Sequence, residues 1–283
     1  MPEHDVEAAI QEIITRMMDR VMDNVLVNDP FIAEQHHAKR PLYAALVPDE
    51  IFKNAHFERR FVTPFGKAWE LLAVAAANAG LGFGTSGHMI TGNVAEERLR
   101  RITEVLNELE HPPKDGNARR RPDWQRELEY VLSGGGEPIP VPVICDVYVE
   151  DRRKPRKVKK YSFELKAPLP NSDQTKVSKE KMLKLFAMEP CQIDGAYYAL
   201  PYNPYGRKQD YAWSIPERWF NMKNDPIVLI GDEFWEKVGG KGAYQALIDA
   251  VNGIGPGYRE RIYREFLGIE PPDDAEILLK AIV

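Results

Sequence analysis

The chain has 283 residues, with 38 Lys and Arg against 43 Asp and Glu, and its formal net charge is −5. That length suits one large domain or two fused lobes, and 43% hydrophobic with 29% charged residues is ordinary for a globular protein. Apolar runs such as residues 71–77 are far shorter than the ~20 residues of a membrane span, and the acidic start is unlike a signal peptide. Disordered, collagen-like and transmembrane classes are therefore excluded.

The first third of the chain is predicted to be helical. Apolar residues recur three and four positions apart over residues 6–27, which is the period of a helix with one buried face. The pair at 63–64, Thr-Pro, predicts the cap and first turn of a helix that ends near Gly80. Asn93 and Glu96 form a capping pattern for the helix after it.

A polar linker at residues 114–121 separates two predicted parts. Residues 1–121 are expected to form a helical N-terminal lobe. Residues 122–283 are expected to form the second part, which opens with a short helix from Pro122 that the glycines 134–136 close. One continuous domain is the alternative to this division.

After these glycines the pattern changes from helical to extended. Residues 139–149 are rich in Val and Ile and predict a buried strand, and residues 158–167 predict a second strand after a turn. The remaining predicted elements are a basic helix at 175–188, strands at 196–202 and 226–230, and helices at 244–251 and 259–267. Helices first, strands in the middle and helices last predict an α/β or α+β fold.

Three glycines, Gly82, Gly84 and Gly87, match the G-x-G-x-x-G spacing of a dinucleotide-binding loop. That loop requires a strand before it and a helix N-terminus directly after it. The sequence predicts a helix before these glycines, so we interpret them as a flexible connector.

The two cysteines, Cys145 and Cys191, both lie within apolar stretches. This usage suits buried thiols in a reducing compartment better than a disulfide framework. A single bridge between them is the alternative.

Basic residues are concentrated in one segment of this acidic chain. Residues 151–184 contain twelve Lys and Arg against four Asp and Glu, so their local charge is +8 and the rest of the chain carries −13. Such segregation is typical of a protein that presents one face to a polyanion. A lysine-rich hairpin and helix exposed to solvent would give the same count.

The most informative pattern joins the two predicted strands. Asp146 lies within the apolar run 143–147, where a carboxylate needs a partner or a metal ion. Glu164 and Lys166 are two positions apart, so on a strand they point to the same face. If the strands form a hairpin around the turn at 152–157, Asp146 lies beside Glu164.

Two carboxylates and an ammonium group in one patch suit phosphodiester hydrolysis. Mg²⁺ prefers carboxylate and water oxygens, and it polarises a phosphodiester and stabilises the leaving oxygen. Lys166 is suited to holding the attacking water and to offsetting negative charge on the phosphorus. The alternative is a solvated strand face with Asp146 capping the turn.

These residues resemble the PD-(D/E)xK nuclease signature, with Cys145 in place of the usual proline before the aspartate. More specifically, the chain is similar to type II restriction endonucleases of the TdeIII group. The stretches that carry this resemblance are residues 58–70, 167–176 and 228–240. The resemblance implies a mixed central sheet flanked by helices and a homodimer that uses Mg²⁺, or Mn²⁺ as a substitute. Such an enzyme cleaves double-stranded DNA at a short palindromic site, with GGNCC-like sites associated with the group.

The resemblance also assigns roles to the two predicted parts and to single residues. The lobe at 1–121 would support dimerisation or embrace DNA, and residues 122–283 would form the PD-(D/E)xK catalytic core. Asp146 and Glu164 would be metal ligands, the carbonyl of Leu165 a third ligand, and Lys166 the residue that serves the water. Glu70, on the N-terminal helix, would add an outer carboxylate, and an exposed helix glutamate is the equally weighted alternative.

Residues after the trio are expected to contact DNA, with amides suited to base edges and lysines to phosphates. Those expected from the basic helix and the segment before it are Asn171, Asp173, Gln174, Lys176 and Lys179. The loop at 202–208 would add Tyr202, Asn203 and Arg207 as base-reading residues, and a plain turn is its alternative.

The function predicted from these patterns is that of a type II restriction endonuclease in a prokaryotic cytoplasm. A cognate DNA methyltransferase in the same cell would protect host DNA without needing to bind the enzyme, and no membrane is expected as a partner. Two alternatives stay open: a repair or structure-specific nuclease on the same core, and an inert DNA-binding module.

Overall fold

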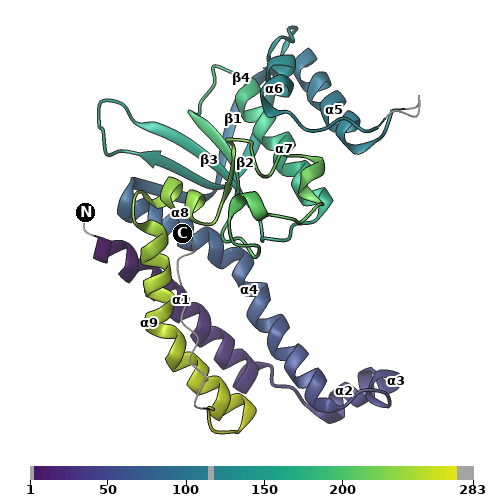
Figure 1. Ribbon diagram of the computed structural model, residues 1–283, viewed down its shortest axis with the longest axis vertical. Helices are drawn as coiled ribbons and strands as arrows, with labels where there is room; N and C mark the ends of the chain where they lie inside the picture. The colour runs from purple at the N-terminus through teal and green to yellow at the C-terminus, as the bar shows by residue number, and fades with distance from the viewer. Residues whose placement is uncertain (1–2, 114–117, 273–283) are drawn as a thin grey trace. The chain divides into compact units, whose positions relative to one another are not determined.

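The computed structural model describes residues 3–113 and 118–272, which fall into two compact units (Figure 1). One unit, here called the sheet unit, comprises residues 73–244, and the other, the helical unit, comprises residues 3–72 and 245–272. This division differs from the predicted boundary after residue 121. The reason is that residues 82–95 form a strand of the sheet, so they belong with the core rather than with an N-terminal lobe.

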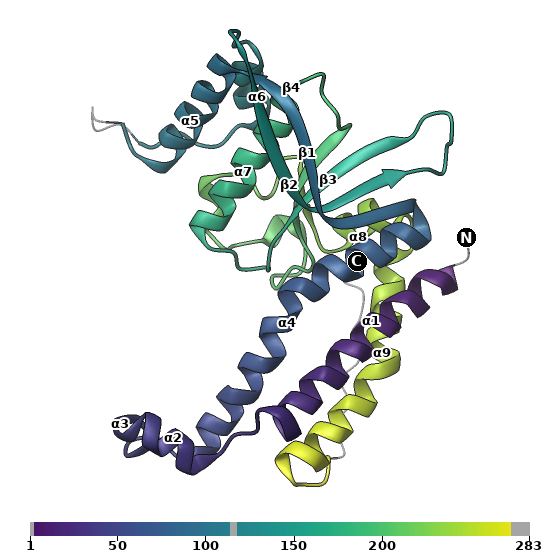
Figure 2. The same ribbon diagram turned by 180° about the vertical axis from the view of Figure 1, so that it is seen from behind.

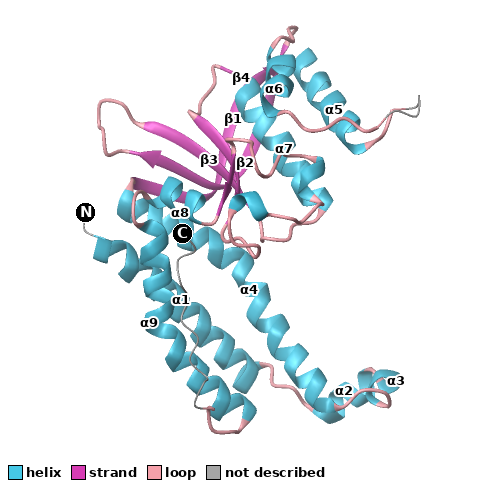
Figure 3. Cartoon of the chain, viewed as in Figure 1, coloured by secondary structure: helices cyan, strands magenta, loops and turns pink. Residues whose placement is uncertain are grey.

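The sheet unit is built on a mixed sheet, which confirms the predicted α/β class (Figure 3). Its described strands are β1 Gly82–Ala95, β2 Pro138–Asp151, β3 Lys159–Leu165, β4 Met188–Glu189, β5 Gly195–Leu200 and β6 Val228–Ile230. They lie in the order β4-β1-β2-β3-β5-β6. Neighbours from β4 to β3 are antiparallel, whereas β3, β5 and β6 run parallel.

Helices α5 Glu96–Glu110, α7 Ser172–Ala187 and α8 Asp232–Gly239 pack against this sheet (Figure 2). Helix α6 Trp124–Leu132 packs on α5 and α7. The helix α7 begins where Asn171 accepts a hydrogen bond from the backbone N–H of Gln174 at 2.9 Å, a side-chain cap that fixes the first turn. Its buried side chains, such as Met182 and Leu183, join those of the strands in one core cluster. Because α7 follows β3 directly in the chain, its side chains are brought to the region where β2 and β3 carry the acidic pair.

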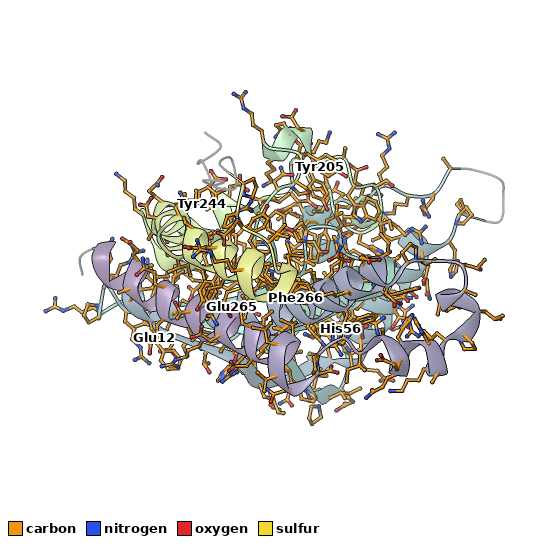
Figure 4. The ribbon with its side chains drawn as sticks, turned by 90° about the horizontal axis from the view of Figure 1, so that it is seen from below. Glu12, His56, Tyr205, Tyr244, Glu265 and Phe266 are labelled. Carbon is orange, nitrogen blue, oxygen red and sulfur yellow. The ribbon has the colours of Figure 1, made fainter. Side chains whose placement is uncertain are left out.

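The helical unit contains α1 Glu3–Asp23, α2 Ala33–Lys39, α3 Pro41–Ala44, most of α4 Asp49–Gly80 and most of α9 Ala243–Arg261. Wider π-helical turns extend α1 to Asn28 and α9 to Leu267. Helices α1 and α9 lie side by side in Figures 1 and 2, where Tyr258 donates a hydrogen bond to the carbonyl of Thr15 at 3.0 Å. Phe266, labelled in Figure 4, packs on Phe57 with ring centroids 4.8 Å apart. Among the described helices, none combines the length and the hydrophobicity that crossing a membrane requires.

Helix α4 corrects one prediction about a helix start. The helix begins at Asp49 and continues through Pro64, so the expected start at residues 63–64 is wrong, although its end at Gly80 is confirmed. Aromatic rings spaced four residues apart, from Phe57 through Phe61 and Phe65, contact one another at centroid distances of 6.1 and 4.9 Å. This continuous aromatic stripe favours one long helix despite the hydrogen bond that the proline cannot donate.

The glycine-rich segment is a strand, so its interpretation as a flexible connector is also wrong. Gly84 allows a close approach to α4, because a Cβ there would lie 2.7 Å from the Cβ of Ala77. The strand continues through Asn93, and α5 begins only at Glu96, with Ala95 at its N-cap and no side-chain cap. The predicted capping pattern is therefore absent at this helix start, because sheet pairing keeps Asn93 extended.

The cysteines are both free thiols. Cys145 is buried in β2, as predicted, whereas Cys191 is exposed, so the prediction of burial is wrong for the second cysteine. The cause is position, because Cys191 lies in the connection between β4 and β5 rather than in a strand.

Candidate active site

The two strands that carry the acidic pair form the predicted hairpin. Their ladder includes Val147 opposite Phe163, and the same register places Asp146 opposite Glu164. Instead of a further strand pairing, the carboxylate of Asp146 accepts a hydrogen bond from the backbone N–H of Leu165 at 3.0 Å. The side chain of Asp146 thus links the two strands at the point where they separate.

Lys166 completes the patch immediately after β3. Its ammonium group donates to the carboxylate of Asp146, lies 3.5 Å from a carboxylate oxygen of Glu164, and lies 3.2 Å from the carbonyl oxygen of Leu165. One cationic nitrogen therefore contacts all three oxygen donors that the sequence singles out. The structure brings the predicted trio together.

Lys181, on α7, also reaches the acidic pair, and sequence analysis did not single it out. Its ammonium lies 2.9 and 2.8 Å from the two carboxylate oxygens of Glu164 and 3.4 Å from Asp146. Ser178, one turn earlier on the same helix, donates to Glu164 at 3.4 Å. Ser178 and Lys181 are three residues apart and therefore lie on one face of α7. This spacing, on the helix that follows Glu164 in the chain, is the sequence signal that could have predicted their contact with Glu164.

Burial controls the electrostatics of this site. The side chain of Glu164 is 1% exposed, whereas those of Asp146 and Lys166 are 21% and 16% exposed. Burial, and then repulsion from the Asp146 carboxylate, raise the pKa of Glu164 to about 7, although Lys166 and Lys181 oppose the rise. Burial lowers the pKa of Lys181, but the Glu164 carboxylate outweighs it, so that pKa lies above its ordinary value.

These donors fit a hard divalent cation. Carboxylate and carbonyl oxygens are the ligands that Mg²⁺ prefers, and the contacts of Lys166 mark a point that both carboxylates and the Leu165 carbonyl reach together. No cluster of three or more His, Cys, Asp or Glu suited to a metal occurs among the described residues. A cation here would depend on two acidic side chains, a carbonyl, and ligands from water or substrate.

Glu70 is located in the helical unit, on α4. Its carboxylate accepts a hydrogen bond from Lys67 at 2.6 Å, on the same helix. A glutamate on the surface of a helix would form this contact, and so would a carboxylate in the outer shell of a metal site. The role of Glu70 at the metal site therefore stays a prediction.

Lys179 corrects the prediction of its DNA contact. Its side chain is fully buried, 2.5 Å from the carboxylate of Glu127 on α6 and 2.5 Å from the carbonyl oxygen of Trp219. Burial lowers the pKa of Lys179, and Glu127 opposes this effect. A lysine enclosed in this way cannot reach a DNA phosphate. It instead fixes α7 against α6.

The other residues expected to contact DNA lie at the surface or close to it. Asp173 and Gln174 are exposed in the first turn of α7, next to the capping residue Asn171. Lys176 is 30% exposed and forms an ion pair with Glu110. At these positions the side chains are accessible to DNA, and their contacts with it stay predictions.

The loop at 202–208 is organised by Asn203. Its side chain accepts a hydrogen bond from the N–H of Tyr205 at 2.9 Å and donates one to the carbonyl of Arg207 at 2.7 Å. Tyr202 and Arg207 are exposed beside it. The loop thus has the hydrogen bonds of an Asn-centred turn. Contact of its exposed side chains with DNA bases stays a prediction.

Comparisons with known proteins match this chain to type II restriction enzymes. A family model described as type II restriction endonuclease, HinfI, matches residues 6–255. The type II restriction enzyme HgiCII of Herpetosiphon aurantiacus is 25% identical over 235 residues, which cover 81% of this chain and 82% of that enzyme. The type II restriction enzyme HgiBI of the same organism is 23% identical over 224 residues, 76% of this chain and 77% of that enzyme.

Proposed function

This chain belongs to the HinfI family of type II restriction endonucleases, and from that premise we propose that Asp146, Glu164 and Lys166 form its catalytic site. Type II restriction enzymes act on double-stranded DNA, so the enzyme is a site-specific deoxyribonuclease. We further propose that the site is a PD-(D/E)xK centre and that residues 167–176 resemble the TdeIII group of these enzymes.

The observation that carries the proposed site is the position of the Lys166 ammonium. It contacts Asp146, Glu164 and the Leu165 carbonyl at once, so a cation at this corner meets three oxygen donors. Asp146 and Glu164 would hold Mg²⁺, or Mn²⁺ in its place, together with the Leu165 carbonyl. When bound, the ion supplies positive charge that polarises the phosphodiester and stabilises the leaving oxygen.

The residues of the chain then have separate tasks. Lys166 orients the attacking water and offsets the negative charge that develops on the phosphate oxygens. Lys181 holds Glu164 and Asp146 in position from α7, because its ammonium contacts both. The attacking oxygen forms a new bond to phosphorus as the bond from phosphorus to the 3′ oxygen breaks. The products carry a 5′-phosphate and a 3′-hydroxyl.

The partners follow from a palindromic duplex. Two scissile phosphates are related by a two-fold axis, and each chain contributes one proposed site, so a C2 homodimer is the simplest assembly that cuts both strands. Lys176 and the exposed first turn of α7 are proposed to contact the DNA. We place the enzyme in a prokaryotic cytoplasm with a cognate methyltransferase that protects host DNA.

A plasmid digestion tests the proposed site. Wild-type protein with Mg²⁺ should convert a plasmid of known sequence into discrete bands, whereas a smear would indicate a nonspecific nuclease. Asp146→Asn removes a charge but keeps an oxygen that accepts the Leu165 N–H, so folding should persist while cleavage falls by about a hundredfold or more. Binding of the same DNA in Ca²⁺ should survive, because phosphate contacts come from other residues. Asp146→Asn cleavage within about tenfold of wild type would remove Asp146 from the catalytic site.

A further inference from the structure

The helical unit contains a cavity whose lining includes none of the residues of the proposed catalytic site. It has a volume of about 270 Å³ and is lined by α2, the start of α4 and the segment before α2. We call it the α2–α4 pocket. All of its lining residues lie between Asp29 and Arg60.

Aromatic rings form part of the wall of the α2–α4 pocket. Phe52 packs on His36 with centroids 4.1 Å apart, and Phe31 lies 5.6 Å from His36. His56, labelled in Figure 4, donates from Nε2 to the carbonyl of Asp29 at 2.6 Å. Burial, and then the charge of Arg59, lower the pKa of His56, which favours the neutral form of its ring. Flat apolar and neutral rings of this kind suit stacking against another ring.

Cations form the rest of the lining. Among the described residues of the wall, Asp29 is the one acidic side chain, and it already forms an ion pair with Arg60. Lys39, Arg40 and Arg59 have no carboxylate partner within the described parts of the chain. The pocket therefore carries a surplus of positive charge that no described residue of its wall neutralises.

Two buried nitrogen atoms in the pocket wall lack hydrogen-bond partners. They are Nε2 of His36 and Nε of Arg60, and neither finds an acceptor among the described residues. A buried polar group without a partner costs free energy, so such atoms are normally paired. An acceptor oxygen from a ligand in the pocket would satisfy them.

We propose that the α2–α4 pocket binds a nucleotide unit, with its phosphate at Arg40 and Arg59 and its base against Phe52. The unpaired cations fit a phosphate, which arginine recognises through two parallel hydrogen bonds. The rings fit a base, because base–aromatic stacking recurs in proteins that bind single-stranded nucleic acid. The nucleotide comes from either a DNA strand or a free mononucleotide, which share this chemistry. A DNA source makes the pocket an additional DNA contact of the proposed enzyme, formed by residues other than those proposed for cleavage.

Titration calorimetry without divalent metal tests this proposal on the whole chain. The probes are thymidine 5′-monophosphate, inorganic phosphate and a single-stranded thymidine dodecamer. The variants are Arg59→Gln and Arg40→Gln, with Arg20→Gln as the matched control, since Arg20 is exposed on α1 of the same unit and outside the pocket. Loss of one charged hydrogen bond should weaken nucleotide binding by about tenfold or more in both pocket variants and leave the control unchanged.

Each outcome decides the proposal. Binding of the monophosphate that depends on Arg59 and Arg40 supports it with a free nucleotide as the source. Binding of the dodecamer alone, with the same dependence, supports it with DNA as the source. Equal affinity for inorganic phosphate and the monophosphate would show that the base contributes no binding energy, and it would overturn the proposal. Equal effects of the pocket and control variants, or no binding of any probe, would also overturn it. Because the titrations contain no metal, a failure of plasmid cleavage leaves their result unaffected.

Discussion

The variant Lys181→Met tests how the charge of Lys181 affects Glu164 at the proposed catalytic site. Methionine keeps most of the length of the lysine side chain but has no charge. In the wild type, the ammonium lies 2.8 Å from a carboxylate oxygen of Glu164, whose side chain is 1% exposed. With an effective dielectric constant of about 20, that contact is worth about 6 kcal/mol before the cost of desolvating the lysine. Lys166 stays in place in the variant, and Lys181 is 25% exposed to screening solvent. We therefore expect the ionised form of Glu164 to lose about 1.4–2.8 kcal/mol of stabilisation relative to its protonated form.

The direction of the pH effect follows from the charge that is removed. Glu164 binds a cation only when ionised, and loss of a neighbouring positive charge disfavours the ionised form. Its pKa, about 7 in the wild type, should therefore rise by about one to two units. At pH 7.5 the ionised fraction falls from about three quarters to between a quarter and a few per cent, which weakens metal binding by about three- to twenty-five-fold. Near pH 9.5 both proteins are mostly ionised and their metal affinities should converge.

Calorimetric titration with Mn²⁺ from pH 6.5 to 9.5 measures this difference. Lys184→Met is the matched control, because Lys184 lies one turn further along α7 and pairs with Glu180 at 2.5 Å. The control should follow the wild-type curve at every pH. Tighter metal binding by Lys181→Met at pH 7.5 would show that the lysine mainly competes with the ion. A ratio of affinities that does not change with pH would refute the role of Glu164 ionisation.

Three further predictions concern stability, DNA binding and assembly. Lys179→Met should destabilise the fold by about 3–5 kcal/mol in urea unfolding, because buried Glu127 loses its nearest cation and keeps only the more distant Arg120, at 3.9 Å, among the described residues. Adding Glu127→Leu should recover much of the loss, and a small effect of the single variant would contradict a buried pair. Lys176→Ala should lower the salt slope of log K for specific and random DNA by about one unit, and an unchanged slope would mean that this lysine serves only its ion pair with Glu110. Mixing wild-type subunits with excess Lys166→Ala subunits should accumulate nicked plasmid circles, because each mixed dimer keeps one working site. Only linear and uncut plasmid, or a monomer as the active species on DNA, would rule out the dimer.

The trio was predictable because it depends on one local relationship. A turn between two strands fixes their register, so Asp146 and Glu164 become neighbours without any knowledge of the rest of the fold. Lys181 depends in addition on how α7 packs against the sheet, which its own sequence does not specify. The long strand β1 was not predicted for a related reason. Gly84 in β1 is small enough for α4 to pack closely against the strand, and the sequence alone does not reveal that contact.

Charge counting failed at Lys179 because the count treats every lysine of a basic helix alike. The buried positions of α7 recur three and four residues apart, at Thr175, Ser178, Lys179, Met182 and Leu183. Lys179 belongs to this stripe by spacing, so helical periodicity would have placed it inside despite its charge. Its acidic partner Glu127 lies more than fifty residues earlier in the chain, on a different helix, and no local pattern joins the two.

The two lysines of α7 restrict where the length of this chain can change during evolution. Lys179 and Lys181 are two residues apart, so they point to nearly opposite sides of the helix, one to Glu127 and the other to Glu164. One residue inserted between the N-cap Asn171 and Lys179 would turn both lysines by about 100° and separate both from their carboxylates. The connection ahead of the cap is held as well, because Tyr211 and Trp213 donate hydrogen bonds to the carbonyls of Pro168 and Pro170 at 2.9 Å. Length differences among relatives should therefore fall outside the segment from Lys166 to Lys181, where every added residue would move a lysine away from its carboxylate.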